Sequence, residues 1–336
     1  MEDAHPSMSH RRPDTSRPAL IVLAALLFGA VAGPVSAQPA DVALRQVGEV
    51  EHPPISEMSG IVKSRRYENV WWVHNDSGDG PRLFAVDSTG RVHLAPWREE
   101  SYAAGTTAAE PEAEPAWPGL ALGNAAHIDY EDIALDDSTL YVGDIGNNGN
   151  ARRDLGIYVV PEPYFYARRT RPMTHLRIRY PDQDTFPAET WHYDAEGLFV
   201  ADGRLHVLTK RRRGQQISQT EPGTTLYRLD TEHPHRVNTL TRVDRHDTIP
   251  PPTAAALSPS GDRLAVLCTS GLWVFPRPDN GADWLSTDPR RLELSETRLK
   301  QAEAVTWDDA RTLRITNENR DVFVLPLAAG RSANTE

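Results

Sequence analysis

Cysteine is almost absent from this sequence, which has a single one, Cys268, among 336 residues. One thiol forms no internal disulfide and excludes zinc sites that need two or four thiolates. Cys268 ends an apolar run that begins at Leu264, so we expect a small buried hydrophobic side chain at this position.

Positive charge is also scarce. The chain carries 36 basic and 47 acidic side chains, for a formal net charge of −11. A chain this acidic repels phosphate backbones and anionic membrane surfaces at long range. We therefore expect no nucleic-acid partner.

Several catalytic motifs are missing as well. The sequence has no Gly-x-Ser-x-Gly elbow, no His-Glu-x-x-His pair and no Walker A loop. Gly143, Gly146 and Gly149 are spaced by three, but no helical pattern follows them, which excludes dinucleotide binding.

Long hydrophobic runs are limited to residues 19–33, an uncharged stretch preceded by Arg11, Arg12 and Arg17. A basic segment, an apolar core and the small residues at 34–37 predict a signal peptide over 1–37, cleaved after Ala37. The alternative is an uncleaved anchor, but the run is shorter than the roughly 20 residues that span a bilayer. We expect an exported protein, periplasmic or extracellular, with no membrane span after cleavage.

Helical periodicity is lacking beyond residue 40, where short alternating runs are separated by Gly, Pro, Asn and Asp. One unit recurs: a strand, a tight turn, a second strand that ends in polar residues, and a third strand. Its copies begin at Ser59, Glu131, Glu196, Ala255 and Glu303. This repeat predicts an all-β fold, a β-propeller domain over 38–330, followed by a disordered tail at 331–336.

A fourth strand fits each of the first four copies, at Val92–Leu94, Leu176–Tyr180, Val237–Leu240 and Leu292–Leu294. The fifth copy lacks one, and Val42–Gly48 can complete it, which would remove two open sheet edges. We expect five blades. A sixth remains an alternative within 99–127 or 161–190, although an inserted loop at about 98–127 is the simpler interpretation of the first stretch.

Three segments, Tyr130–Ala134, Tyr141–Asn148 and Asp194–Leu198, resemble a group of secreted bacterial β-propeller proteins. More loosely, the repeats are similar to NHL, TolB-like and calcium-dependent phosphotriesterase-like propellers. The resemblance covers most of residues 41–330. It implies the fold, but such propellers include hydrolases, lactonases, lyases and binding scaffolds, so it does not imply one activity.

Propeller geometry brings the start of each first strand and the end of each second strand to one face. The acids that lead first strands there are Asp129, Glu131, Asp132, Asp194, Glu196 and Glu303. The predicted ligand-binding residues are Asn75, Asp76, Asp144, Asn147, Lys210, Arg211 and Asn317. Lys210 and Arg211 open a basic run, which is either part of an anion site or a solvated hairpin tip.

Carboxylates around one mouth repel one another and need a cation or raised pKa values. Oxygen ligands favour Ca²⁺, with Glu131, Glu196 and Glu303 as the predicted metal ligands. The alternative is structural: each glutamate accepts backbone N–H groups of the next blade. Residues 75–80 resemble the start of a calcium loop, but Val86 stands where a closing glutamate is needed, so a hairpin turn is the alternative.

The candidate catalytic residues are Asp132, Asp194, His127 and His192, because each histidine precedes an acid by two residues and can act as a base or metal ligand. A hydrogen-bonded loop histidine is the alternative. Two functions follow: a non-enzymatic propeller that binds a small anionic molecule or an envelope protein, or a calcium-dependent hydrolase of a phosphate ester or lactone.

Overall fold

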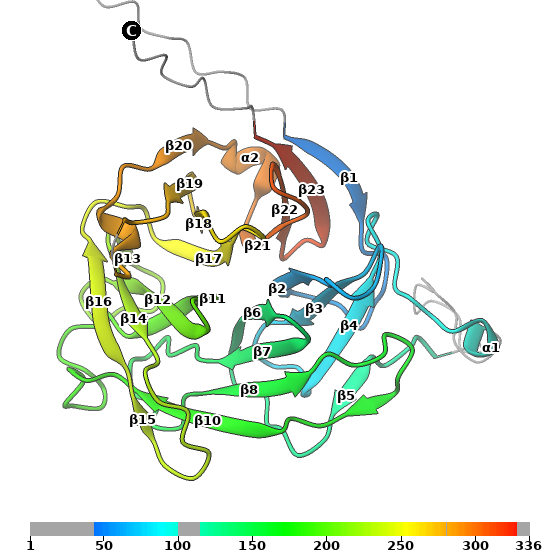
Figure 1. Ribbon diagram of the computed structural model, residues 1–336, viewed down its shortest axis with the longest axis horizontal. Helices are drawn as coiled ribbons and strands as arrows, with labels where there is room; N and C mark the ends of the chain where they lie inside the picture. Colours follow the sequence, from blue (N-terminus) through cyan, green and yellow to red (C-terminus); the bar gives the residue numbers. More distant parts are fainter. Residues whose placement is uncertain (1–43, 100–114, 280, 328–336) are drawn as a thin grey trace, which may run out of the picture. The chain divides into compact units, whose positions relative to one another are not determined.

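The computed structural model describes residues 44–99, 115–279 and 281–327. Their strands form five sheets around a common centre, so the protein is a five-bladed β-propeller, as predicted (Figure 1). The predicted signal peptide and the predicted tail lie outside the described residues. Among these residues, no helix has both the length and the apolar character needed to cross a membrane.

Within each blade the strands follow one another outward from the centre. The innermost strands are β2 (Met58–Lys63), β6 (Tyr130–Asp136), β11 (Asp194–Ala201), β17 (Pro252–Leu257) and β21 (Ala302–Trp307). The second strands are β3 (Trp71–Asn75), β7 (Thr139–Asp144), β12 (Arg204–Arg212), β18 (Arg263–Cys268) and β22 (Thr312–Asn317). The third strands are β4 (Arg82–Val86), β8 (Gly156–Pro161), β14 (Thr224–Arg228), β19 (Gly271–Pro276) and β23 (Asp321–Pro326).

The outermost strands are β5 (Leu120–Leu122), β10 (Thr174–Arg179), β16 (Thr241–His246), β20 (Arg290–Glu293) and β1 (Arg45–Glu49). Short additional elements are β9 (Arg169–Thr170), β13 (Thr220–Glu221), β15 (Asn238–Thr239), α1 (Pro96–Glu99), α2 (Glu296–Leu299) and the 3₁₀ turn η1 (Trp284–Ser286).

The fifth blade is closed by β1, the first strand of the described chain. It pairs antiparallel with β23, with Arg45 opposite Val324 and Glu49 opposite Asp321. This confirms the predicted closure. Because the first and last strands of the described chain lie in one sheet, no gap is left between the first and last blades.

Two predicted outer strands are wrong. The segment at 92–94 contributes one isolated bridge, Val92 to Val86, and β5 pairs with the other end of β4 instead. The segment at 237–240 forms β15, which runs parallel to β10 of the second blade, while β16 is the outer strand of the third blade. Each prediction followed β-forming residues alone, and the pairing partner of such a short run is set by tertiary contacts.

The hydrophobic core is divided into five clusters, one between each pair of neighbouring blades. Successive residues of a strand point to opposite faces of the sheet. Trp71 therefore packs against the fifth blade and Trp72 against the second, and both are buried. Because both faces are buried, strands such as β18 and β23 contain consecutive apolar residues in place of the alternation expected from the sequence. Cys268 is buried in one of these clusters, as predicted.

Candidate functional site: an acidic ring at the channel mouth

Each innermost strand has a β-bulge near its start, where one extra residue interrupts the pairing with the second strand. A bulge redirects the side chain of the extra residue. The five bulged residues are Ser59, Glu131, Glu196, Thr253 and Glu303. Because they occupy equivalent positions in the five blades, we call them the bulge ring.

The two hydroxyl residues of the bulge ring connect neighbouring blades. Ser59 Oγ donates a hydrogen bond of 2.9 Å to the carbonyl of Glu131. Thr253 Oγ1 donates one of 2.8 Å to the carbonyl of Ala302. These hydroxyls therefore join the first blade to the second and the fourth to the fifth.

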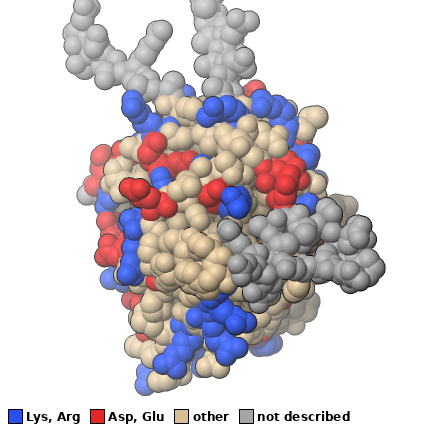
Figure 2. All heavy atoms as spheres, turned by 90° about the vertical axis from the view of Figure 1, so that its right-hand side faces the viewer, with Lys and Arg blue, Asp and Glu red and all other residues tan. Residues whose placement is uncertain are grey.

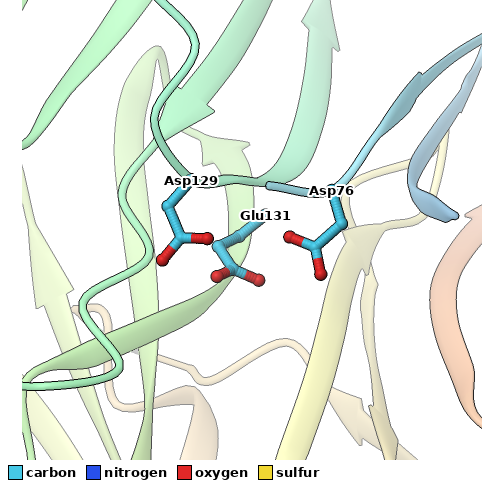
Figure 3. A group of neighbouring side chains, drawn as sticks. All are labelled: Asp76, Asp129 and Glu131. Carbon is cyan, nitrogen blue, oxygen red and sulfur yellow. The ribbon is translucent and has the colours of Figure 1, made fainter. Parts of the chain in front are cut away.

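Two groups of carboxylates meet at the ring. Asp76, Asp129 and Glu131 each place one oxygen within 4.8 Å of the others, and Figure 3 shows the three carboxylates turned toward one another. Glu131, Asp194 and Glu196 form a second group by the same measure. Glu131 belongs to both groups. Glu303, the third predicted metal ligand, belongs to neither group.

The carboxylate of Glu131 is the least compensated of these groups. Its residue is 7% exposed, and no described side chain or amide donates a hydrogen bond to it. Burial, reinforced by Glu196 and Asp76, raises the pKa of Glu131 well above its ordinary value. Burial raises the pKa of Asp129 to about 6, with repulsion from Asp76 and Asp194, and that of Glu303 to about 7, with repulsion from Glu318 and Asp76. Raised pKa values of this kind favour either a bound proton or a bound cation at these carboxylates.

Gly146 makes room for the first group. A Cβ atom on this residue would lie 2.1 Å from Glu131 Oε1 and 2.4 Å from Asp129 Cγ. Its neighbour Asn148 donates a hydrogen bond of 3.1 Å from Nδ2 to Asp129 Oδ2. The loop after β7 thus forms a wall of the site. The glycine spacing was noted in the sequence, but this role could not be inferred from it.

Two basic side chains of β12 compensate the second group. Lys210 Nζ lies 2.6 Å from Glu196 Oε1, and Arg212 Nη2 lies 2.5 Å from Asp194 Oδ2. Arg211 between them points to the other face and pairs with Asp247 at 2.9 Å. Burial opposes the charge of Lys210, but Glu196 and the other acids raise its pKa. Arg212 was not among the predicted site residues, and the two-residue period of a strand is the signal that places it beside Lys210.

Asp132 has the inter-blade role that was considered for the glutamates. Its Oδ1 accepts from the Ile133 amide at 2.8 Å, and its Oδ2 accepts from the amides of Leu198 at 2.8 Å and Ala255 at 3.3 Å. The buried carboxylate therefore ties the second, third and fourth blades together. None of the three ring glutamates makes such a bond among the described residues.

The remaining acid of the second group also has a backbone partner. Asp194 Oδ1 accepts from the Asn147 amide at 2.7 Å while its other oxygen binds Arg212. Asp194 is thus partly structural, and its predicted catalytic role remains a prediction.

Several predicted ligand residues are held in loop hydrogen bonds. Asp144 accepts from the Asp129 amide at 3.0 Å and pairs with Arg152 at 2.9 Å, and Asn147 donates to the Tyr193 carbonyl. These contacts position the loop that carries Asp129, and they leave ligand binding by Asp144 and Asn147 as a prediction.

Two asparagines at the ends of second strands also bond within their loops. Asn75 accepts from the Ser56 amide at 3.1 Å and donates to Asp79, which itself pairs with Arg82. Residues 75–80 therefore form a hydrogen-bonded turn from which Asp76 reaches the ring. Asn317 donates to the Leu299 carbonyl at 2.9 Å.

The two predicted histidines lie outside both carboxylate groups. His127 Nδ1 bonds the Gly80 carbonyl at 2.9 Å, and its ring stacks on Tyr130 at 3.9 Å between centroids. His192 Nε2 bonds Glu221 at 2.8 Å, and burial lowers its pKa despite that contact. The structure thus brings together the acids, Lys210 and Arg212, without either histidine.

The concentration of acids at the mouth is a local feature. On the flank shown in Figure 2, Lys and Arg side chains lie among Asp and Glu side chains. Beside the bulge ring lie two basic groups, Lys210 and Arg212, and six carboxylates. We call these carboxylates the acidic ring: Asp76, Asp129, Glu131, Asp194, Glu196 and Glu303. The site is therefore deficient in positive charge.

No protein-family model matches the chain, and no curated protein matches its sequence. Solved structures that are similar to this chain have low sequence identity to it. A glucose dehydrogenase is 10% identical, with 85% of this chain and 99% of that chain covered and a TM-score of 0.43. The glutaminyl cyclase of Myxococcus xanthus is 10% identical, with 85% and 97% covered and a TM-score of 0.43. The PQQ-bound aldose sugar dehydrogenase of Streptomyces coelicolor is 13% identical, with 86% and 99% covered and a TM-score of 0.41.

Proposed function

We propose that this protein is an exported propeller that binds Ca²⁺ at its acidic mouth. The observation that supports this most directly is the group formed by Asp76, Asp129 and Glu131, whose oxygens lie within 4.8 Å of one another. These ligands are all carboxylates, which suit calcium better than zinc or copper. The export part of the proposal rests on the predicted signal peptide.

The two carboxylate groups differ in their basic partners, and this difference supports a site for one ion. Lys210 and Arg212 already compensate Asp194 and Glu196, whereas Glu131 has no basic partner among the described residues. Asp76 is only half-buried, so it gives the ion a route from solvent. A calcium ion takes six to eight oxygens, and three carboxylates with water can supply them.

A bound calcium ion would also determine which kind of molecule the site binds. Positions of the calcium shell that face solvent accept a carboxylate or phosphate oxygen, which is how a small anionic molecule would bind beside an acidic ring. An envelope protein that presents an acidic side chain would bind by the same chemistry. We favour this binding role because the two predicted histidines have other partners.

The test is calcium binding by the whole chain after treatment with EDTA, measured by calorimetry and by melting. We expect about one ion per chain and a higher melting temperature with calcium, since a bound ligand stabilises the folded state. Glu131→Gln should weaken binding at least tenfold. Glu232→Gln, which changes an exposed acid outside the ring, is the matched control. Wild-type affinity in Glu131→Gln, or no calcium binding at all, would refute the site.

A calcium-dependent hydrolase is the second candidate, and Glu303 favours it. Its half-buried carboxylate has no hydrogen-bond partner among the described residues, and its pKa of about 7 suits a general acid or base. A panel of phosphate esters and lactones distinguishes the two functions. Calcium-dependent turnover that falls at least tenfold in Glu303→Gln would establish the hydrolase, and no turnover with calcium bound would leave the binding role.

A further inference from the structure

A cavity opens at the end of the channel opposite the acidic mouth. It has a volume of about 470 Å³, and all five innermost strands contribute to it, through residues 61–65, 133–135, 198–200, 255–257 with 259, and 305–310. These residues follow the bulge ring along each strand. The cavity is therefore separate from the acidic mouth, and we call it the lower pocket.

Asp132 separates the lower pocket from the acidic ring. Its carboxylate binds the amides of Leu198 and Ala255, and both of these residues line the pocket. The side chain is buried, at 1% exposed. The hydrogen-bonded carboxylate thus closes the inner end of the pocket, and a molecule in the pocket would not touch the proposed calcium ligands.

Most residues that line the lower pocket are apolar in type, while polar and apolar atoms share its exposed surface almost equally. Fifteen of its 21 lining residues are aliphatic, aromatic or proline, and each blade supplies some of them. Phe199 and Trp307 belong to this lining but are buried in clusters between the blades, and Trp307 Nε1 donates to the Ala256 carbonyl at 3.0 Å. Volume and composition both match sites that bind small organic molecules.

The charged groups of the pocket have partners of their own. Asp308 accepts from Trp71 Nε1 at 2.9 Å and pairs with Arg314 at 2.9 Å. Lys63 Nζ donates to the Asp308 carbonyl at 2.6 Å, and Arg65 lies 4.0 Å from an oxygen of Asp136.

The last charged lining residue, Asp309, accepts from the Arg311 amide at 2.7 Å. The lining thus holds two cations and two carboxylates, with contacts to each. These formal charges cancel, so a charged ligand would lose its hydration in a pocket with no net opposite charge, which is unfavourable.

We propose that the lower pocket binds an uncharged small molecule that carries both apolar and polar groups. The proposal does not depend on calcium binding at the other end of the channel. It uses the apolar walls for affinity and the balanced charges to exclude ions.

Two fluorescent probes of nearly the same shape test both parts. N-phenyl-1-naphthylamine is neutral, and 1-anilinonaphthalene-8-sulfonate adds one negative charge. We expect the neutral probe to saturate a single site on the whole chain, and the anionic probe to bind at least tenfold more weakly. Equal affinity for the two probes would overturn the predicted ligand class.

The Val200→Phe variant tests whether the probe binds in the lower pocket. Val200 lines the pocket and is half-buried. The larger phenylalanine ring should therefore fill the cavity and lower the affinity for the neutral probe at least tenfold. Val237→Phe makes the same change at a residue that is 42% exposed and outside the pocket, and should leave the affinity unchanged.

Circular dichroism checks that Val200→Phe folds, and Ala256→Leu replaces it if it does not. Ala256 also lines the pocket and is half-buried. Undiminished binding in the folded variant would place the probe elsewhere, for example on exposed Trp97, and would overturn the proposal.

Discussion

The ammonium of Lys210 lies 2.6 Å from Glu196 Oε1, inside a ring whose other glutamates have no basic contact within 4 Å among the described residues. The lysine thus occupies the half of the ring formed by Glu131, Asp194 and Glu196, where a metal ion would otherwise fit. A tethered cation on one side and a cation from solution on the other would share the negative charge.

Replacing Lys210 by methionine should therefore make the protein more dependent on calcium. Removing one partner of a buried ion pair costs about 3–5 kcal/mol, because the other charge stays buried without compensation. We expect Lys210→Met to unfold at a lower urea concentration than wild type in EDTA and to recover part of the difference in calcium.

Arg211→Met is the control for this response, since Arg211 pairs with Asp247 on the other face of β12. Its response to calcium should equal that of wild type. A Lys210→Met variant that gains no more stability from calcium than wild type would contradict the shared-charge interpretation.

Stability without calcium should fall as the pH rises from about 4 to 7. The folded pKa values of Asp129 (about 6) and Glu303 (about 7) lie above their ordinary values, mainly because of burial. The folded state therefore binds more protons than the unfolded state in this window, so raising the pH favours unfolding. Urea titrations in EDTA at pH 5 and pH 7.5 measure the difference.

Glu303→Gln should reduce the difference between the unfolding free energies at pH 5 and pH 7.5 by about 2 kcal/mol. One unit of pKa shift corresponds to about 1.4 kcal/mol. Glu232→Gln is again the control, because Glu232 is exposed. Calcium should also flatten the profile if it binds the ring. A wild-type profile for Glu303→Gln in EDTA would show that its carboxyl does not titrate in this window.

Asp132→Ala should destabilise the protein by about 3 kcal/mol or more. The change leaves the amides of Ile133, Leu198 and Ala255 without their acceptor, and each unsatisfied buried amide costs about 1–3 kcal/mol. Asp132→Asn keeps one acceptor oxygen and should cost less. Urea unfolding gives both values, and a loss below 1 kcal/mol for the alanine variant would argue against the inter-blade role.

Deleting residues 44–49 should abolish cooperative folding. Without β1 the edge of β23 is exposed and the contact of buried Leu44 with the fifth blade is lost. An open sheet edge promotes association between chains. Size-exclusion chromatography and melting of the shortened chain test this, and a monomer with the wild-type melting temperature would show that the closure is dispensable.

The blades could be predicted because their signals are local. The expected starts at Ser59, Glu131, Glu196 and Glu303 coincide with the bulged residues, since turn residues and alternating runs are visible in the sequence. The outer strands were harder to predict. The segment at 237–240 has strand character, but whether it joins the second or third blade depends on contacts distant in sequence.

The roles of the acids could not be predicted from residue type. Glu131 and Asp132 are adjacent, yet among the described residues the Glu131 carboxylate has no hydrogen-bond donor and the Asp132 carboxylate has three amides. Arg212 was missed because the phase of β12 decides which basic residues face the ring. Both depend on single-residue register, which a sequence pattern does not resolve.

The pairing of β1 with β23 has a consequence for the order of folding. Arg45 pairs with Val324, so this contact joins residues from the two ends of the domain sequence and closes a loop that contains all the other strands. The fifth blade stays incomplete until its last strand has been synthesised. A nascent chain therefore cannot finish the ring while any part of the domain is still on the ribosome.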